Sequence, residues 1–321
     1  MKRVLIVDSN NLFLRSYIVN PSISLSGQPC GGLKGFLQAL QKICRQTKPD
    51  MIVACWDGAG GSKKRKSKKK DYKAGRKPLR LNRAIRNLSE DQEHENKIWQ
   101  HVRTMEYMNY MPVIQFVYES VEADDVIAYV TQHKCFEDWQ KLIVSNDKDF
   151  YQLLDDKTVQ YRPQQEEVLN RNAIVEKFEI HPVNITLARA MAGDKSDNLP
   201  GIGSCGLATA AKRFPFLKEE TTHTLTDLLD YSKKMLQEKK LKVYENVVEN
   251  FKSLKLNYEM MQLYAPLLSY QTKTAINNTL DEPELTFNRT EVKKKIIEDG
   301  LGDINLDEIF QIFNKIALDN S

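Results

Sequence analysis

Several aspartates follow short apolar runs of the chain, and their placement is the feature of the sequence most able to do chemistry. Asp8 and Asp57 each end such a run, and Asp147 and Asp149 follow a third one. The carboxyl ends of parallel strands are the edge at which open α/β sheets bind ligands. We therefore expect these four carboxylates to gather at one edge of a sheet.

Five more acids extend this set. Glu122, Asp124 and Asp125 stand at the start of a predicted helix, and Asp194 and Asp197 lie in a Gly-rich stretch further along. Carboxylates that crowd together repel one another unless cations neutralise them. Mg²⁺ suits an all-carboxylate site, and two such ions about 3.5–4 Å apart would stabilise both the attacking and the leaving oxygen of a phosphodiester. Mn²⁺ could substitute for Mg²⁺.

A strongly basic segment precedes the helix-start acids. Residues 63–86 contain thirteen Lys or Arg and one acid, Asp71, so the segment carries +12 in a chain whose net charge is +4. The rest of the chain is therefore acidic. This division indicates a polyanionic ligand that the basic segment would hold, with nucleic-acid contacts from Lys63, Lys64, Arg65 and Lys66.

Alternating strand and helix patterns define the elements that must position these residues. Apolar runs predict strands at residues 4–7, 51–56, 113–118 and 142–144. Apolar residues at helical spacing predict one helix after Gly31 and another at about residues 121–133. The β-α-β order predicts an α/β fold with a mostly parallel sheet flanked by helices. From about residue 172 the pattern is mainly helical, and residues 306–316 predict a short amphipathic helix that packs on the parent domain.

Composition excludes several classes of protein. Hydrophobic residues make up 41% of the 321-residue chain, and no apolar run is long enough to span a membrane. The five cysteines are scattered without a C-x-x-C pair, which argues against a disulfide framework and a zinc site. We expect a cytoplasmic protein in a reducing compartment.

A receiver domain of the response-regulator type is an alternative, since Asp8 and Asp57 would then be its acidic pair. Such a domain needs two adjacent acids after its first strand. Here Asp8 is followed by Ser9 and Asn10, which are not acids. It also leaves the basic segment and the later acids unexplained.

Three segments in order carry a resemblance to a known family. They are Val121 to Asp125, Ser145 to Asp149, and Gly193 to Gly203 with the sequence GDKSDNLPGIG. By these segments the chain resembles the 5′ nucleases, the flap endonuclease and 5′→3′ exonuclease group, and especially its stand-alone bacteriophage members of the phage RNase H type. The resemblance implies their PIN-like fold and a two-metal cleavage of phosphodiesters, and a place in the host cytoplasm if a phage encodes the protein.

The resemblance also implies roles for individual residues. One metal ion would be held or surrounded by Asp8, Asp57, Glu122, Asp124 and Asp125, and the second by Asp147, Asp149, Asp194 and Asp197. The family has a helical arch over the active site, and Tyr72 to Arg76 is similar to its arch segment. Lys73 and Arg76 would then contact the scissile phosphate, and Tyr72 would offer a face for base stacking.

The Gly193 to Gly203 segment resembles the start of the family's helix-hairpin-helix, part of a helix-three-turn-helix element. Gly201 and Gly203 would let the backbone approach a phosphodiester, Lys212 would add a phosphate contact, and turn carbonyls could hold K⁺. Such contacts follow the duplex backbone without reading sequence.

The expected organisation has two parts. Residues 1–180 form an α/β nuclease domain with a basic arch insertion at about 58–111, and residues 181–321 form a helical DNA-binding region with the hairpin at about 186–214. The expected substrates are DNA with 5′ flaps, nicks or RNA primers, cut by a monomer that works with a replication polymerase, clamp or single-strand-binding protein. A small Mg²⁺-dependent ribonuclease and an inactive DNA-binding scaffold remain alternatives.

Overall fold

A six-stranded sheet lies at the centre of the protein. The structure, a computed structural model, describes residues 1–75, 80–85 and 88–318. The strand order is β3-β2-β1-β4-β5-β6, with all neighbours parallel except β6, which runs antiparallel to β5. The strands are β1 (Arg3–Asp8), β2 (Met51–Trp56), β3 (Ile114–Val117), β4 (Gln140–Val144), β5 (Thr158–Arg162) and β6 (Glu167–Leu169).

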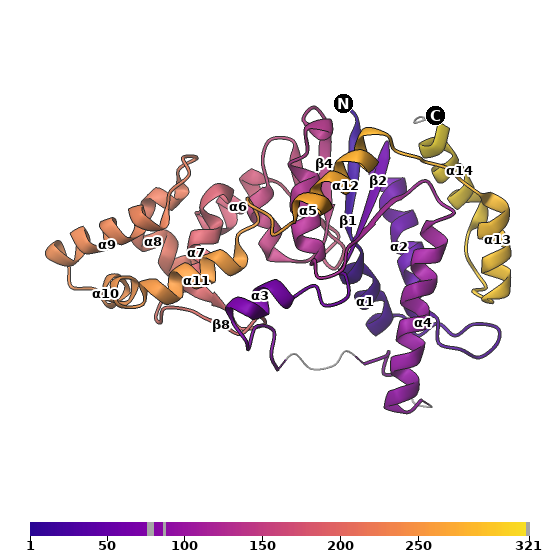
Figure 1. The fold of residues 1–321 in the computed structure, drawn as a ribbon, viewed down its shortest axis with the longest axis horizontal. Coiled ribbons are helices and arrows are strands. Elements are labelled where there is room, and N and C mark those ends of the chain that lie inside the picture. Colours follow the sequence, from indigo (N-terminus) through magenta and orange to yellow (C-terminus); the bar gives the residue numbers. More distant parts are fainter. Residues whose placement is uncertain (76–79, 86–87, 319–321) are drawn as a thin grey trace.

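Helices cover both faces of this sheet, which is why β1 and β2 are apolar along almost their whole length (Figure 1). One face packs against α1 (Ser9–Val19), α2 (Gly31–Thr47), α4 (Glu90–Met108), α13 (Arg289–Glu298) and α14 (Leu306–Leu318). The other face packs against α5 (Ala123–Thr131) and α12 (Tyr270–Asp281).

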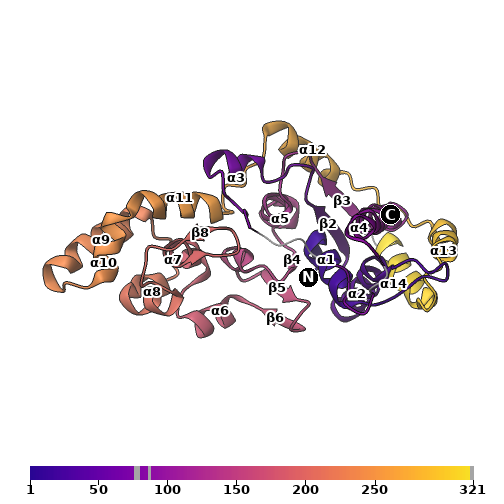
Figure 2. The same ribbon diagram turned by 90° about the horizontal axis from the view of Figure 1, so that it is seen from below.

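A second group of helices has its own apolar core and extends away from the sheet (Figures 1 and 2). Its elements are α6 (Arg171–Phe178), α7 (Ile185–Ala192), the short strands β7 (Gly193–Asp194) and β8 (Leu199–Pro200), α8 (Leu207–Arg213), α9 (Leu225–Glu238), α10 (Lys242–Glu249) and α11 (Phe251–Met261). Single turns of 3-10 helix lie at residues 134–136, 182–184 and 215–218, and a longer one spans 148–153.

The expected α/β fold is confirmed, with two strands, β5 and β6, added to the four that the apolar runs indicate. The expected division at residue 180 differs from the packing. α12, α13 and α14 return to the sheet, where Ile276, Ile296 and Phe313 are buried in its two apolar layers. α14 therefore packs on the parent domain, as its amphipathic pattern predicts, and the second helical group ends near Met261.

In its described residues, the insertion between β2 and β3 contains two helices of very different length. α3 (Lys63–Lys68) is a short basic helix, whereas the long helix α4 is preceded by the N-cap residue Ser89, which forms a capping box with Gln92. Arg76 of the expected arch lies outside the residues that the structure describes.

Candidate active site

Four aspartates approach one another where β1, β2 and β4 end. Asp8 is the last residue of β1 and caps α1, and Asp57 directly follows β2. Asp147 follows β4, and Asp124 lies in the first turn of α5. The parallel order of the strands thus brings together carboxylates from four distant parts of the sequence.

The pKa values of these acids reflect their crowding. Burial raises the pKa of Asp8 to about 7, and the charges of Asp57 and Asp147 add to it, although the Ser145 hydroxyl donates a hydrogen bond to Asp8 at 2.7 Å. Burial, with Asp147, Asp8 and Asp57 as charged neighbours, also raises the pKa of Asp124 well above its ordinary value. A bound cation would relieve this repulsion.

A second acidic group adjoins the first and contains an arginine. Arg189 of α7 forms ion pairs with Asp149 at 2.5 Å and with Asp194 at 3.0 Å. The pKa of Asp149 is raised to about 7, mainly because the carboxyl is buried. The charge of Arg189 lowers this pKa, whereas the charges of Asp147, Asp197 and Asp194 raise it. Sequence reasoning missed Arg189, because a lone arginine in an apolar helix carries no signal of what it will contact.

The donor set fits a hard divalent cation by its chemistry, since it offers carboxylate oxygens that repel one another. Within residues 1–75, 80–85 and 88–318, however, no three Asp, Glu, His or Cys side chains already stand together as a metal-binding group.

Metal-free protein should lose stability as the pH rises from about 4 to 7. Asp8 and Asp149 keep protons in the folded state up to about 7, whereas the unfolded chain releases them near 3.8, so folding becomes less favourable across this window. Calorimetry in EDTA at pH 5 and pH 8 should show the lower melting temperature at pH 8, and Mg²⁺ should narrow the difference. A difference that Mg²⁺ leaves unchanged would contradict an acidic metal site.

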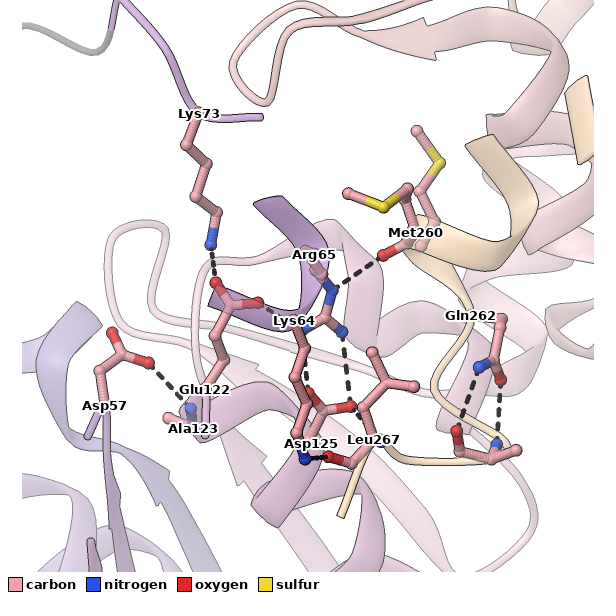
Figure 3. A network of polar contacts seen from close by, with 12 residues as sticks. Asp57, Lys64, Arg65, Lys73, Glu122, Ala123, Asp125, Met260, Gln262 and Leu267 are labelled. Atoms are coloured by element: carbon pink, nitrogen blue, oxygen red, sulfur yellow. Dashed lines mark hydrogen bonds and ion pairs between the residues drawn. The ribbon is translucent and has the colours of Figure 1, made fainter. Parts of the chain in front are cut away.

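Glu122 and Asp125 take part in a different network (Figure 3). The Arg65 guanidinium is bound to both carboxylates, at 2.8 Å from Asp125, and its Nε donates to the Met260 carbonyl at 3.0 Å. Lys73 Nζ pairs with the other oxygen of Glu122, and the backbone N–H of Leu267 donates to Asp125. These two expected metal ligands are therefore held by cations of the basic segment in this structure.

The basic residues divide into exposed and buried ones. Lys63, Lys64 and Lys66 are exposed, as a DNA contact requires, and Lys64 also donates to the Leu267 carbonyl. Arg65 is only 3% exposed, so the structure does not place it with the lysines as a phosphate contact. Tyr72 is likewise buried, against Leu199, Met260 and Met261, where its ring has no free face for base stacking.

The turn at Lys73 connects the basic segment to the loop that carries Asp197. The backbone N–H of Lys73 donates to the Asp197 carbonyl at 3.1 Å, and Asn198 donates to the Asp71 side chain at 2.7 Å. Lys73 has a positive φ of 57°. Its ammonium lies close enough to Asp124 to lower the pKa of that acid against the effect of burial. Among the described residues of the expected arch, Lys73 is the one whose charged group lies beside the acids.

α7 and α8 flank the turn that contains Gly201 and Gly203, as the Gly and Pro positions predict. A side chain at Gly201 would bring its Cβ within 2.4 Å of the Ala192 carbonyl oxygen, so this glycine is required for close packing on α7. Gly203 has a φ of +83°, which favours glycine. Lys212 is exposed on α8.

A histidine of α4 also reaches the acidic edge. His101 Nε2 lies 2.9 Å from Asn10 Oδ1, and the Asn10 amide donates to Asp57 at 2.7 Å. Because a carboxylate only accepts, Asn10 must present its oxygen to His101, which makes Nε2 the donor. The His101 ring lies edge-on to Phe13 and Trp56. Burial lowers the pKa of His101, which favours the neutral ring. Sequence reasoning missed this pair, since nothing links the two positions along the chain.

His101→Ala should weaken divalent-metal binding, because Asp57 would lose the chain of hydrogen bonds that orients it. Partners of this kind typically contribute tenfold or more to metal affinity, so we expect about a tenfold loss. Mn²⁺ titration followed by electron paramagnetic resonance, without DNA, measures this directly. His101→Gln, whose amide can still donate, should restore most of the affinity, and His94→Ala on the exposed side of α4 should be neutral. Unchanged Mn²⁺ affinity in His101→Ala would refute the link.

The fold and its acidic edge define a class of protein, the metal-dependent nucleases built on a parallel sheet. Residues 3–179 match the family model described as the 5′-3′ exonuclease, N-terminal resolvase-like domain. The chain therefore belongs to the 5′-3′ exonuclease family and is a nuclease that hydrolyses phosphodiesters.

Relatives of known function agree with this assignment. The chain is 30% identical to the flap endonuclease Xni of Shewanella sp. (strain W3-18-1), over 83% of its own length and 91% of that protein. It is 25% identical to the 5′-3′ exonuclease of Aquifex aeolicus (strain VF5), over 98% of its own length and 96% of that protein. It also matches 26% of the length of the thermostable DNA polymerase I of Thermus thermophilus, at 28% identity.

Solved structures share the fold. The 5′-exonuclease of bacteriophage T5, with divalent zinc ions bound, superposes with a TM-score of 0.67 at 19% identity, over 93% of this chain and 100% of that one. The T5 D15 flap endonuclease, in a pseudo-enzyme-product complex with DNA and metal ions, superposes with a TM-score of 0.66 at 16% identity. The match covers 98% of this chain and 100% of that one.

Proposed function

We propose that the protein removes 5′ ends from DNA during replication, cutting 5′ flaps, nicked strands and RNA primers annealed to DNA. The observation that carries this proposal is the set of crowded aspartates at the carboxyl edge, with the Lys73 ammonium beside them. The flap endonuclease and 5′-exonuclease relatives support the same direction of cleavage.

Two Mg²⁺ ions are the cofactor we propose, with Mn²⁺ as a substitute. In this proposal Asp8, Asp57, Asp124 and Asp147 would hold one ion, and Asp149, Asp194 and Asp197 would hold the second. When bound, such ions activate water and neutralise charge on the phosphate. The zinc-bound T5 5′-exonuclease supports a divalent requirement.

The protein's own residues would position the substrate. Lys73 lies beside Asp124 and would exchange its pairing with Glu122 for the scissile phosphate, and we assign Arg76 the same kind of contact. Duplex would lie along the hairpin, with the backbone at Gly203 and Lys212 facing its phosphates and turn carbonyls holding K⁺. In this proposal residues 1–180, together with Asp194 and Asp197, supply the chemistry, and the helices up to Met261 hold the duplex.

Neutralising exposed lysines of α3 should reduce the salt dependence of DNA binding. Each phosphate contact contributes roughly 0.7 to 0.9 to the slope of log affinity against log salt, so Lys63→Gln with Lys66→Gln should lower the slope by about 1.4 to 1.8. Fluorescence anisotropy with labelled flap DNA at about 50 to 200 mM salt measures this slope. Lys293→Gln with Lys294→Gln, exposed on α13, should change nothing, and an equal change in both pairs would contradict a specific role for α3.

The partners we propose are a replication polymerase, a clamp or a single-strand-binding protein, acting with a monomeric nuclease in the cytoplasm. The relationship to DNA polymerase I supports a replication role. Among the helices of the described residues, none has both the length and the apolarity to cross a membrane.

Cleavage of end-labelled substrates tests the proposal. Purified protein with Mg²⁺ should cut 5′-flap, nicked and RNA-primed duplexes and should leave blocked 5′ ends intact. Cleavage confined to single-stranded RNA would favour the ribonuclease alternative, and tight DNA binding without cleavage in Mg²⁺ or Mn²⁺ would favour the scaffold.

A further inference from the structure

A buried glutamine holds the segment after β4, which carries two of the acids. Gln160 lies in β5, and its register partner on the parallel strand β4 is Ile143, two residues before Ser145. Its side-chain amide nitrogen donates to the Ser145 carbonyl at 2.8 Å and to the Asp147 carbonyl at 2.7 Å. The side chain is fully buried. One glutamine therefore attaches the main chain on both sides of Asn146 to the interior of the sheet.

The orientation of this amide is fixed by its two partners. Both are carbonyl oxygens, which only accept, so the NH₂ group of Gln160 must face them and both of its hydrogens are used. The Oε1 atom is then left buried, and it has no hydrogen-bond partner among the residues that the structure describes. A buried acceptor without a partner is unfavourable. The fold therefore retains a group that costs stability at the point where this segment is held.

The segment needs such an attachment because its acids repel their neighbours. Besides burial, the charge of Asp147 raises the pKa of the carboxyl groups around it. These groups belong to Asp8, Asp124 and Asp149. Repulsion between like charges pushes the segment after β4 away from the ends of β1 and α5. Hydrogen bonds to two of its carbonyls oppose this movement and fix where the Asp147 carboxylate lies.

The neutrality of the amide is equally important. Arg189 holds Asp149 by an ion pair at 2.5 Å, and against the effect of burial its charge lowers the pKa of that acid. An amide, by contrast, holds the main chain and leaves the charge of Asp147 available to a cation. A second buried glutamine does the same for the next acid, since Gln152 donates to the Asp149 carbonyl at 2.7 Å and to the Met261 carbonyl at 3.0 Å.

We propose that Gln160 is a positioning residue for the metal site, which acts through the main chain of Asp147 and sets the affinity of the acidic edge for divalent cations. The role of Asp147 in this proposal rests on the proposed function, whereas the role of Gln160 rests on its own contacts. Groups that orient a metal ligand typically contribute tenfold or more to metal affinity. Because Gln160 acts through another residue, its removal should weaken metal binding more than it slows the chemical step.

Mn²⁺ titration of the full-length protein without DNA, followed by electron paramagnetic resonance, tests this role. Gln160→Met keeps an unbranched stem but removes both donors, so we expect a loss of Mn²⁺ affinity of about tenfold or more. Gln160→Asn, whose amide is one methylene too short to reach both carbonyls, should show the same loss and replaces Gln160→Met if that variant does not fold.

Asn184→Leu is the matched control for the loss of a buried amide. Asn184 is also fully buried, and its side-chain nitrogen donates to two main-chain carbonyls, those of Glu219 at 2.9 Å and Thr221 at 3.0 Å. Urea unfolding should show that Asn184→Leu and Gln160→Met both lose stability. Asn184→Leu should nevertheless bind Mn²⁺ as the unmodified protein does.

Cleavage of flap DNA separates positioning from chemistry. In Gln160→Met the Mg²⁺ concentration for half-maximal cleavage should rise about tenfold or more, whereas the single-turnover rate at saturating Mg²⁺ should stay within a few-fold of normal. Unchanged Mn²⁺ affinity in Gln160→Met, an equal loss in Asn184→Leu, or a slower saturating rate at an unchanged Mg²⁺ requirement would each overturn the proposal. Absence of both Mn²⁺ binding and cleavage in the unmodified protein would instead contradict the proposed function.

Discussion

Asp124→Asn should abolish cleavage without weakening the fold. The substitution keeps the shape of the side chain but removes the charge that Asp147, Asp8 and Asp57 repel, so metal-free protein should become slightly more stable. A metal ion supplies several kcal/mol of transition-state stabilisation, and at about 1.4 kcal/mol per factor of ten its misplacement should cost about a thousandfold in rate. Single-turnover cleavage of flap DNA at saturating Mg²⁺ measures the loss.

Asp125→Asn is the informative comparison, because the family resemblance assigns both residues to the metal whereas the structure separates them. Asp125 lies against Arg65 and the Leu267 N–H, so its amide variant should lose stability in urea unfolding and keep much of its cleavage rate. If Asp125→Asn abolishes cleavage at full stability, Asp125 is a metal ligand and the Arg65 pairing must open during catalysis. Near-normal cleavage by Asp124→Asn would remove that residue from the site.

The strand-end acids could be found from sequence because two simple rules suffice. A buried parallel strand appears as a continuous apolar run, and the residue that ends it lies at the ligand-binding edge. Asp8, Asp57 and Asp147 follow from these rules. β5 was missed because Thr158 to Arg162 alternates polar and apolar residues, although it lies within the sheet, where Thr158 and Gln160 are fully buried.

These rules could not predict which basic residues form buried ion pairs and which are exposed. Within a run such as KKRKSKKK no period distinguishes the one buried side chain from its neighbours. Arg65 is identified only by Glu122 and Asp125, the acids at the start of α5 that it contacts. The same holds for Arg189, and for His101 and Asn10, which meet across 91 positions. Contacts between distant segments depend on tertiary packing, which local pattern does not encode.

Arg65→Met should be the most destabilising single change in the basic segment. Methionine keeps an unbranched apolar stem but leaves the buried carboxylates of Glu122 and Asp125 without their guanidinium. Removing one partner of a buried ion pair typically costs about 3–5 kcal/mol, whereas a surface substitution stays within about 0.5 kcal/mol. Urea unfolding should therefore show a large loss for Arg65→Met and almost none for the exposed neighbour Lys66→Met.

Neutralising the two carboxylates that Arg65→Met leaves unpaired distinguishes an ion-pair role for Arg65 from a packing role. Adding Glu122→Gln and Asp125→Asn to Arg65→Met should recover most of the stability, because neutral amides cost less to bury than unpaired carboxylates. If the triple variant is as unstable as Arg65→Met, the guanidinium stabilises α3 through its packing and its bond to the Met260 carbonyl instead. Recovery of stability without recovery of DNA cleavage would mean that the network also holds Lys73 beside Asp124, since Glu122 is the carboxylate that both cations share.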